Sequence, residues 1–384
     1  MQSLELNRAY YQDCVAKTLQ EHCPWIVERY AAALIGWGSE ILGNDDELSK
    51  DYGWGPRLLL FLNSEDHDAR GDELLAILQK TIPLTFLDQP TRFTNVGPPQ
   101  PTTDPSARVA IQVTTCEAFT KFYIGLPDID VNANPLSSKD WLVINEERLL
   151  RLTAGEVFHD GIGTLTGLRE YFAYFPDDVW RHRLAYVWTA LDRYARILGT
   201  CESRGEVLSV GIVVTRMVEC IIAIVFLLNR VYKPGYMKWV HRQFHKLPDL
   251  SPTIGPALEE MMSHTNRSPV SPLLGPILDE IIPFQSEVAR VPPSEYTRIA
   301  MRVLEHGCCD YNLEPIIDSI RNSIQGELRG LETKLGAADQ WIVEQDLLMV
   351  PPQLGLLAPL YDCEDPLDFV FAKRDSLRPA ESGI

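Results

Sequence analysis

The chain has 384 residues, of which 45% are hydrophobic and 23% are charged, and its formal net charge is −18. These values are typical of a folded protein with room for two domains. The acidic excess argues against general affinity for nucleic acids or membranes, because both surfaces attract basic proteins.

The N-terminus has no basic segment followed by an apolar run, so we expect no secretion signal. The apolar run from Cys220 to Leu228 is shorter than the roughly 20 residues that span a membrane, so we expect a buried helix there. None of the cysteines forms a Cys-x-x-Cys pair. We therefore expect a cytoplasmic protein with reduced thiols and no membrane partner.

The first part of the chain mixes helical and strand patterns. Residues 5–36 carry apolar residues at helical spacing, which predicts two helices separated by Pro24, the second ending at Gly36. Further patterns predict strands over residues 57–63 and 108–115, and helices over residues 72–80 and 117–124.

Helical patterns replace strands from about Asp140 onward. The predicted helices span residues 165–172, 179–198, 207–232, 236–245, 256–263, 273–282, 294–306, 312–335 and 337–346. We therefore predict an α+β protein: a small mixed α/β domain with N-terminal helices at 1–138, a larger all-helical domain at 139–350, and an irregular tail at 351–384.

A Gly-Ser turn followed by acidic residues and an apolar strand marks the candidate site. Gly38-Ser39 precedes Asp45-Asp46 and Asp51, and the apolar run after Arg57 follows. This is the order of a nucleotidyltransferase site, in which the Gly-Ser pair holds a phosphate and carboxylates hold Mg²⁺. Asp51 is the predicted metal ligand, and Asp45 and Asp46 are possible partners. Alternatively, these acids only cap turns.

Three other residues are candidates for a role in the same site. Glu40 is predicted to act as a general base, a metal ligand or a clamp for a cationic substrate, or else to cap the neighbouring turn. Arg57 is expected to pair with Asp51 or with a substrate phosphate. His159 is a candidate general base, and the alternative is a histidine that stabilises a turn.

The segment from Arg230 to Lys246 contains no acidic residue and interleaves cations with aromatic rings. This pattern favours contact with phosphate or nucleic acid, unless the cations only face the acidic bulk of the protein. Lys238 and Tyr236 are the candidates for binding a phosphate. The candidates for a nucleic-acid patch are Arg230, Lys233, Arg242 and Lys246.

Several motifs resemble the DUF4037 family over roughly residues 30–250. They include Asp140-Trp141-Leu142, Tyr174-Phe175-Pro176-Asp177-Asp178-Val179-Trp180 and Tyr232-Lys233-Pro234, together with Gly38-Ser39-Glu40 and Trp54-Gly55-Pro56-Arg57. The resemblance implies a nucleotidyltransferase-fold domain joined to a helical domain. Gly53 stands where the family pattern has a second acid, so we expect a diverged member with a degenerate metal site.

These observations lead to three hypotheses about function. The first is a nucleotidyltransferase-like transferase that acts on a small polar acceptor with a nucleotide or phosphorylated donor, with Mg²⁺ as a possible cofactor. The second is an enzyme of specialised metabolism that uses aminoacyl-tRNA, such as an arginine-containing cyclodipeptide synthase. The third is a binding protein without catalytic activity.

Overall fold

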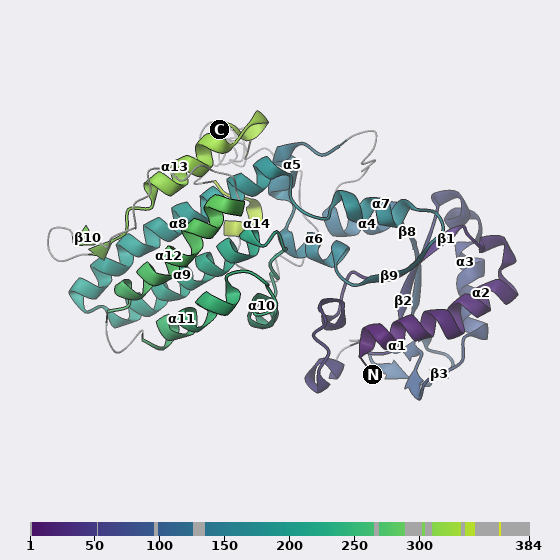
Figure 1. The fold of residues 1–384 in the computed structure, drawn as a ribbon. Helices are drawn as coiled ribbons and strands as arrows, with labels where there is room; N and C mark the ends of the chain where they lie inside the picture. Colours follow the sequence, from purple (N-terminus) through teal and green to yellow (C-terminus); the bar gives the residue numbers. More distant parts are fainter. Residues whose placement is uncertain are drawn as a thin grey trace, which may run out of the picture. The chain divides into compact units, whose positions relative to one another are not determined.

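The computed structural model describes residues 2–51, 53–95, 99–125, 135–264, 269–288, 302–303, 309–331, 335–341 and 361. The chain divides into two compact units, Met1–Pro135 with Glu147–Ala173, and Leu136–Glu146 with Tyr174–Ile384. The first unit combines a sheet with helices and the second is mainly helical (Figure 1). This confirms the predicted α+β class. Residues 147–173, which the sequence analysis placed in the helical domain, belong to the first unit.

A four-stranded sheet forms the centre of the first unit, in the order β8 (Ile111–Thr115), β2 (Leu58–Leu62), β1 (Tyr30–Leu34) and β9 (Glu156–Asp160). Strand β1 is antiparallel to both of its neighbours, whereas β2 and β8 are parallel and are connected through helix α3 (Ser64–Thr81). All residues of β1 and β2 are buried. This explains why β2 is a continuous apolar run without alternation.

The predicted second N-terminal helix is wrong, because residues 30–34 form strand β1. Alanine favours helices in isolation, but the tertiary environment decides here. Ala32 lies opposite Leu60 of β2 on one side and His159 of β9 on the other. A central strand buried on both faces accommodates small side chains well, and β9 completes it from a distant part of the chain.

Helices and short strands cover this sheet. The helices are α1 (Ser3–Tyr10), α2 (Ala16–His22), α4 (Cys116–Ile124), α6 (Glu146–Thr153) and α7 (Thr164–Tyr171), joined by a π-helical turn (Tyr11–Val15) and 3-10 turns at Pro24–Ile26, Ser39–Leu42 and Glu47–Asp51. The short strands are β3 (Thr85–Phe86), β4 (Gln89–Pro90), β5 (Arg92–Phe93), β6 (Pro101–Thr102) and β7 (Arg108–Val109). Tyr10, Leu19 and Leu74 pack with Leu60 of the sheet in one apolar core.

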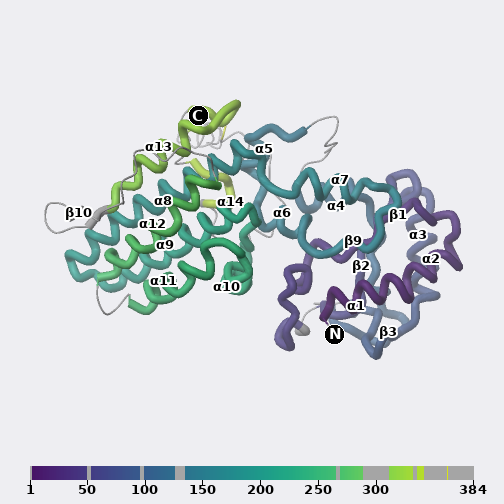
Figure 2. The backbone as a smooth tube through the Cα atoms, viewed as in Figure 1, coloured from purple at the N-terminus to yellow at the C-terminus, as the bar shows by residue number. Residues whose placement is uncertain are grey.

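Two long helices, α8 (Asp177–Arg204) and α9 (Val207–Leu228), pack along each other in the second unit. Figure 2 shows α12 beside them. The remaining elements are α5 (Ser138–Val143), α10 (Met237–Phe244), α11 (Ser251–Ser263), α12 (Ser271–Val288), β10 (Arg302–Val303), β11 (Cys309–Asp310), α13 (Glu314–Ser323), a 3-10 turn (Gly326–Leu328) and α14 (Ala338–Trp341).

Parts of the predicted C-terminal helices differ from the structure. The helix predicted over 312–335 ends at Ser323. Of the helix predicted over 294–306, only residues 302–303 are described, and they form strand β10. Of the tail at 351–384, only Tyr361 is described, and its hydroxyl donates to the Gly336 carbonyl at 2.8 Å.

Helix α9 is the one described helix that is long and apolar enough to cross a membrane by length and composition. Half of its most apolar window is buried within the structure, where α9 packs on α8. A core helix of a folded domain has these same properties, so the finding is weak evidence for a membrane span.

The second unit contains a buried ion cluster. The Arg183 side chain is 1% exposed, and its guanidinium donates to Asp339 at 2.9 Å and to Glu146 at 3.1 Å. The guanidinium carbon also lies 4.4 Å from the centre of the Phe175 ring. Burial raises the pKa of Tyr174 well above its ordinary value. The aromatic motif around residues 174–180 therefore packs a core around a buried cation.

We expect the substitution Arg183→Met to lower the free energy of unfolding by about 3–5 kcal/mol, because Glu146 and Asp339 would be left as uncompensated buried charges. Urea unfolding followed by circular dichroism measures this change. Arg193, an exposed arginine of the same helix, provides the control, and we expect Arg193→Met to change stability by less than about 0.5 kcal/mol. Equal stability of the two variants would contradict this account of the cluster.

Candidate functional site

The turn after β1 is built around glycines that adopt positive φ angles. Gly36 has φ 94° and Gly38 has φ 105°. A Cβ atom at Gly36 would lie 2.7 Å from the Tyr123 hydroxyl, and one at Gly38 would collide with the Glu40 carboxylate and the Arg57 guanidinium. Only glycine meets both the conformational and the spatial requirements of this turn.

Glu40 and Arg57 form a buried ion pair beneath this turn. Their side chains are 5% and 6% exposed. The Arg57 Nε donates to Glu40 Oε1 at 3.1 Å, and Nη2 donates to the same carboxylate and to the Trp37 carbonyl. The guanidinium carbon lies 3.8 Å from the centre of the Trp37 ring. The expected partners of Arg57 were Asp51 or a phosphate, and its partner among the described residues is Glu40.

Helix α1 supports this pair through Asn7, which is fully buried. Its side-chain oxygen accepts from the Arg57 backbone N–H at 2.6 Å, and its amide nitrogen donates to the Ser3 carbonyl at 2.8 Å. Arg57, the residue directly before β2, is thereby linked to helix α1. The orientation of Arg57 thus depends on a residue far away in sequence.

Two groups near the pair stay available for a ligand. Ser39 is half-buried, and within the described part of the chain its hydroxyl makes no hydrogen bond. The Nη1 atom of Arg57 is likewise without a hydrogen bond among the described residues, although Nε and Nη2 are both engaged. A hydroxyl and a guanidinium N–H are both suitable donors to a phosphate.

The predicted metal ligands have other contacts or lie outside the described residues. Asp45 accepts from the Ser3 backbone N–H, and Asp46 accepts from the Ser49 backbone and hydroxyl at 3.0 and 2.9 Å. Asp51 ends the 3-10 turn Glu47–Asp51, and its side chain lies outside the described residues. Asp46 thus makes the contact expected of a residue that stabilises a turn, whereas Asp45 binds a backbone N–H at the N-terminus of α1.

Gly53 could not carry a second acid in this conformation. Its φ is 62°, and a Cβ atom would lie 2.5 Å from the Trp37 ring. Strands β1, β2 and β8 also contain no aspartate or glutamate. The described residues therefore do not fit a two-metal site.

The carboxylates of the fourth strand, β9, accept hydrogen bonds from other groups of the protein. Glu156 accepts from Arg8 at 2.7 Å, and Asp160 accepts from the Gly163 and Thr166 backbones at 2.8 and 2.7 Å at the start of α7. The sheet therefore supplies no carboxylate that is clearly available for a metal ion.

His159 lies on β9 within an aromatic cluster. Its ring centre is 4.5 Å from that of Tyr30, whose hydroxyl is 2.9 Å from the Tyr11 hydroxyl. Burial raises the pKa values of both tyrosines. His159 Nε2 is buried without a hydrogen-bond partner in the described chain, and none of the contacts of this ring involves Glu40 or Arg57.

The predicted basic segment separates into two groups of residues in the second unit. Arg230 pairs with Asp177 at 3.0 Å and stacks 3.7 Å from the Trp180 ring centre. The backbone N–H of Lys233 donates to Glu146 at 2.8 Å, and its ammonium donates to the Pro234 carbonyl at 3.4 Å. Arg230 and Lys233 therefore contact their own unit.

The second group is exposed and is called the α10 cation row: Lys238, Arg242 and Lys246. Lys238 and Arg242 lie 4.7 and 5.8 Å from the Trp239 ring centre, and Lys238 also lies 5.0 Å from that of Tyr236. Partial burial lowers the pKa of Lys246, and the charge of Arg242 lowers it further. The four-residue spacing places Lys238 and Arg242 on one side of α10, and Lys246 lies just beyond the end of this helix.

Residues 141–240 match the DUF4037 family. This family is described as a domain of unknown function. The match confirms the predicted resemblance over these residues, and it includes both the aromatic motif and Lys238. The Gly38–Arg57 block lies outside the matched range.

A solved structure of a nucleotidyltransferase-like protein from Exiguobacterium sibiricum 255-15 is similar to this chain with 10% identity and a TM-score of 0.32. The comparison covers 82% of this chain and 87% of that one. A TM-score this low carries no argument about the site. A search of curated proteins found no match.

Sequence reasoning missed the pairing of Glu40 with Arg57. The sequence Gly36-Trp37-Gly38 could have indicated this contact. A glycine on each side of an aromatic residue indicates that the backbone turns tightly beside closely packed side chains. A pocket of about 730 Å³ beside α3, lined by Gln79, Asn95 and Arg108 among others, includes none of the predicted site residues.

We expect Arg57→Met to lower the free energy of unfolding by about 3–5 kcal/mol, since Glu40 would remain buried without a counter-charge. The double variant Glu40→Met/Arg57→Met should recover much of that loss, because no buried charge is left. Guanidinium unfolding measures both effects.

The exposed pair Arg8–Glu156 serves as the control for this experiment. Arg8→Met should cost no more than about 1 kcal/mol, as is usual for an ion pair at the surface. A loss for Arg57→Met as small as that for Arg8→Met would show that the buried pair does not stabilise the unit.

Proposed function

We propose that this chain is a transferase of the nucleotidyltransferase type, which binds the phosphate of a nucleotide or another phosphorylated donor at the Gly38–Ser39 turn. The observation that carries the proposal is that the Ser39 hydroxyl and the Arg57 Nη1 stay available beside a turn that lacks side chains at Gly36 and Gly38. A phosphate at this turn can accept hydrogen bonds from both donors.

Glu40 acts in this proposal as a positioning residue. Its carboxylate binds Nε and Nη2 of Arg57, which directs Nη1 away from the pair. Because both charges are buried, the pair has one strongly preferred geometry, and the donor site is preorganised. Asp51 follows the turn in sequence and would orient the acceptor.

The proposed reaction uses no two-metal centre, because the described residues do not fit one. Mg²⁺ enters with the nucleotide, whose phosphate oxygens share the coordination of the ion with water molecules. The acceptor is a small polar molecule, in keeping with the net charge of −18. We expect this activity in the cytoplasm, where nucleotides are abundant.

Calorimetric titration with ATP, with and without Mg²⁺, tests the donor site. We expect Ser39→Ala to weaken binding by roughly 2- to 10-fold, since a typical hydrogen bond contributes about 0.5–1.5 kcal/mol. Arg57→Lys should weaken it by at least about 10-fold, because the fixed fork of N–H donors is lost. Ser106→Ala, at an exposed serine of the same unit, should bind like the wild type.

Two results would overturn this proposal. The first is a wild-type protein that binds neither ATP nor the other nucleoside triphosphates under either metal condition. The second is unchanged binding in both site variants. The first result would favour the hypothesis of a binding protein without catalytic activity.

The α10 cation row favours a second candidate function, an enzyme of specialised metabolism that uses aminoacyl-tRNA, such as an arginine-containing cyclodipeptide synthase. Lys238 lies beside Trp239 and Tyr236, and Arg242 lies beside Trp239. Together with the exposed Lys246, they combine the charge and the stacking surface that nucleic-acid contacts use. In this case, Glu40 would bind the cationic amino acid instead of supporting a phosphate site. The row concentrates positive charge locally on an acidic protein.

We expect the double variant Arg242→Glu/Lys246→Glu to weaken tRNA binding. The slope of the logarithm of the binding constant against the logarithm of the salt concentration should become less steep by about 0.7–0.9 for each phosphate contact that is lost. Filter binding over a range of salt concentrations measures both quantities. The control variant Lys17→Glu/Lys121→Glu changes the net charge equally at exposed lysines of the first unit. If both variants lose the same affinity, the effect is one of net charge and the α10 cation row is not the binding surface.

A further inference from the structure

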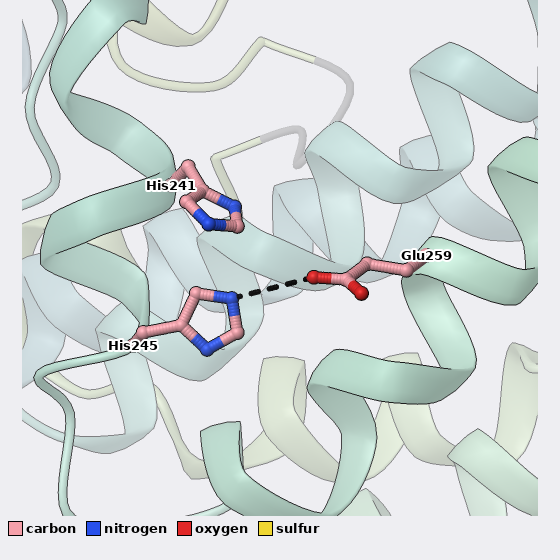
Figure 3. A group of neighbouring side chains, drawn as sticks. All are labelled: His241, His245 and Glu259. Atoms are coloured by element: carbon pink, nitrogen blue, oxygen red, sulfur yellow. Dashed lines mark ion pairs between the residues drawn. The ribbon is translucent and has the colours of Figure 1, made fainter.

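Two histidines and one glutamate of the second unit lie close together, and none of them has been given a role above. His241 lies on α10 and His245 follows one turn later at the C-cap of this helix, and Glu259 projects toward them from α11 (Figure 3). The two imidazole ring centres are 4.4 Å apart, and His245 Nε2 lies 3.7 Å from Glu259 Oε1. One ligand atom from each of the three residues lies within 4.8 Å of the others.

The backbone and a glycine hold this cluster in place. The His245 backbone N–H donates to the His241 carbonyl at 3.1 Å, and the preceding Phe244 is buried. Gly255 lies one turn before Glu259 on α11, and a Cβ atom there would be 3.1 Å from His245 Cε1. The His245 ring therefore rests against the backbone of α11, on the same helix that carries Glu259.

We propose that His241, His245 and Glu259 form a binding site for a zinc ion, with water in the fourth position. Two imidazoles and one carboxylate are a known ligand set for four-coordinate zinc. Zinc–ligand bonds of about 2.0–2.1 Å at tetrahedral angles place the ligand atoms about 3.3–3.5 Å apart. All three side chains are exposed, so small rotations can close the cluster to these distances.

The ligand set selects against Mg²⁺ and Ca²⁺, because these ions require mainly oxygen ligands and the cluster offers one carboxylate. Imidazole suits zinc and the neighbouring transition-metal ions. The bound ion would link α10 to α11 and so limit the movement of α10. The three ligand residues are not among the residues assigned above to a nucleotide or RNA site.

Titration of the metal-free full-length protein with Zn²⁺, and with Co²⁺ as a spectroscopic probe, tests the site. The protein should carry no histidine tag. We expect the wild type to bind one equivalent and to show the intense visible absorption of tetrahedral Co²⁺. His241→Ala and His245→Ala should each weaken binding by at least 10-fold, and Glu259→Gln should weaken it less.

His22→Ala provides the matched control, because His22 is also exposed and lies 3.9 Å from the carboxylate of a neighbouring residue, Glu21. It should bind metal like the wild type. The proposal is overturned if the wild type binds Zn²⁺ no more tightly than the double variant His241→Ala/His245→Ala, or if His22→Ala loses as much affinity as His245→Ala.

Gly255→Ala separates ligand positioning from general folding. The added methyl group should displace the His245 ring by a few tenths of an ångström and lower the affinity for Zn²⁺. Alanine also favours the helical conformation, so the thermal stability of the metal-free protein should not fall. Unchanged affinity in this variant would show that α11 does not position the ring and would contradict this part of the proposal.

Discussion

The buried ion pair between Glu40 and Arg57 is the constraint on which the first unit depends. Two charges removed from water are tolerated only where each is compensated by its partner and by further hydrogen bonds. The Trp37 ring and carbonyl supply one side of this environment, and Asn7 fixes the Arg57 backbone from α1. The pair also requires a glycine at position 38, because a side chain there would occupy the space of both charged groups.

The same constraint affects position 53, where the family pattern has a second acid. The Trp37 ring that stacks on Arg57 also fills the space that a side chain at position 53 would need. An acid at that position would thus require both a different backbone and a displaced Trp37. The orientation of Arg57 and the absence of an acid at position 53 are therefore linked through the Trp37 ring.

The sequence predicted those elements whose pattern is local. The apolar run at β2, the alternation at β8 and the long helices α8 and α9 could all be recognised from their own residues. Strand β1 could not, because its alanines favour a helix and only its neighbours β2 and β9 determine its conformation. The site shows the same limit, since the Gly38–Ser39 turn is visible in the sequence but the partner of Arg57 depends on packing.

Helix α10 shows how one basic segment can hold two kinds of site. Within α10, Lys238 and Arg242 of the cation row are four residues apart, and His241 and His245, at its C-cap, have the same spacing and are offset from them by one residue. One residue corresponds to about 100° around a helix, so the two rows occupy neighbouring faces. A zinc ion on the histidine face would add positive charge beside the cation row. An anionic ligand on that row and the metal ion would then favour each other's binding, and this coupling must be equal in both directions.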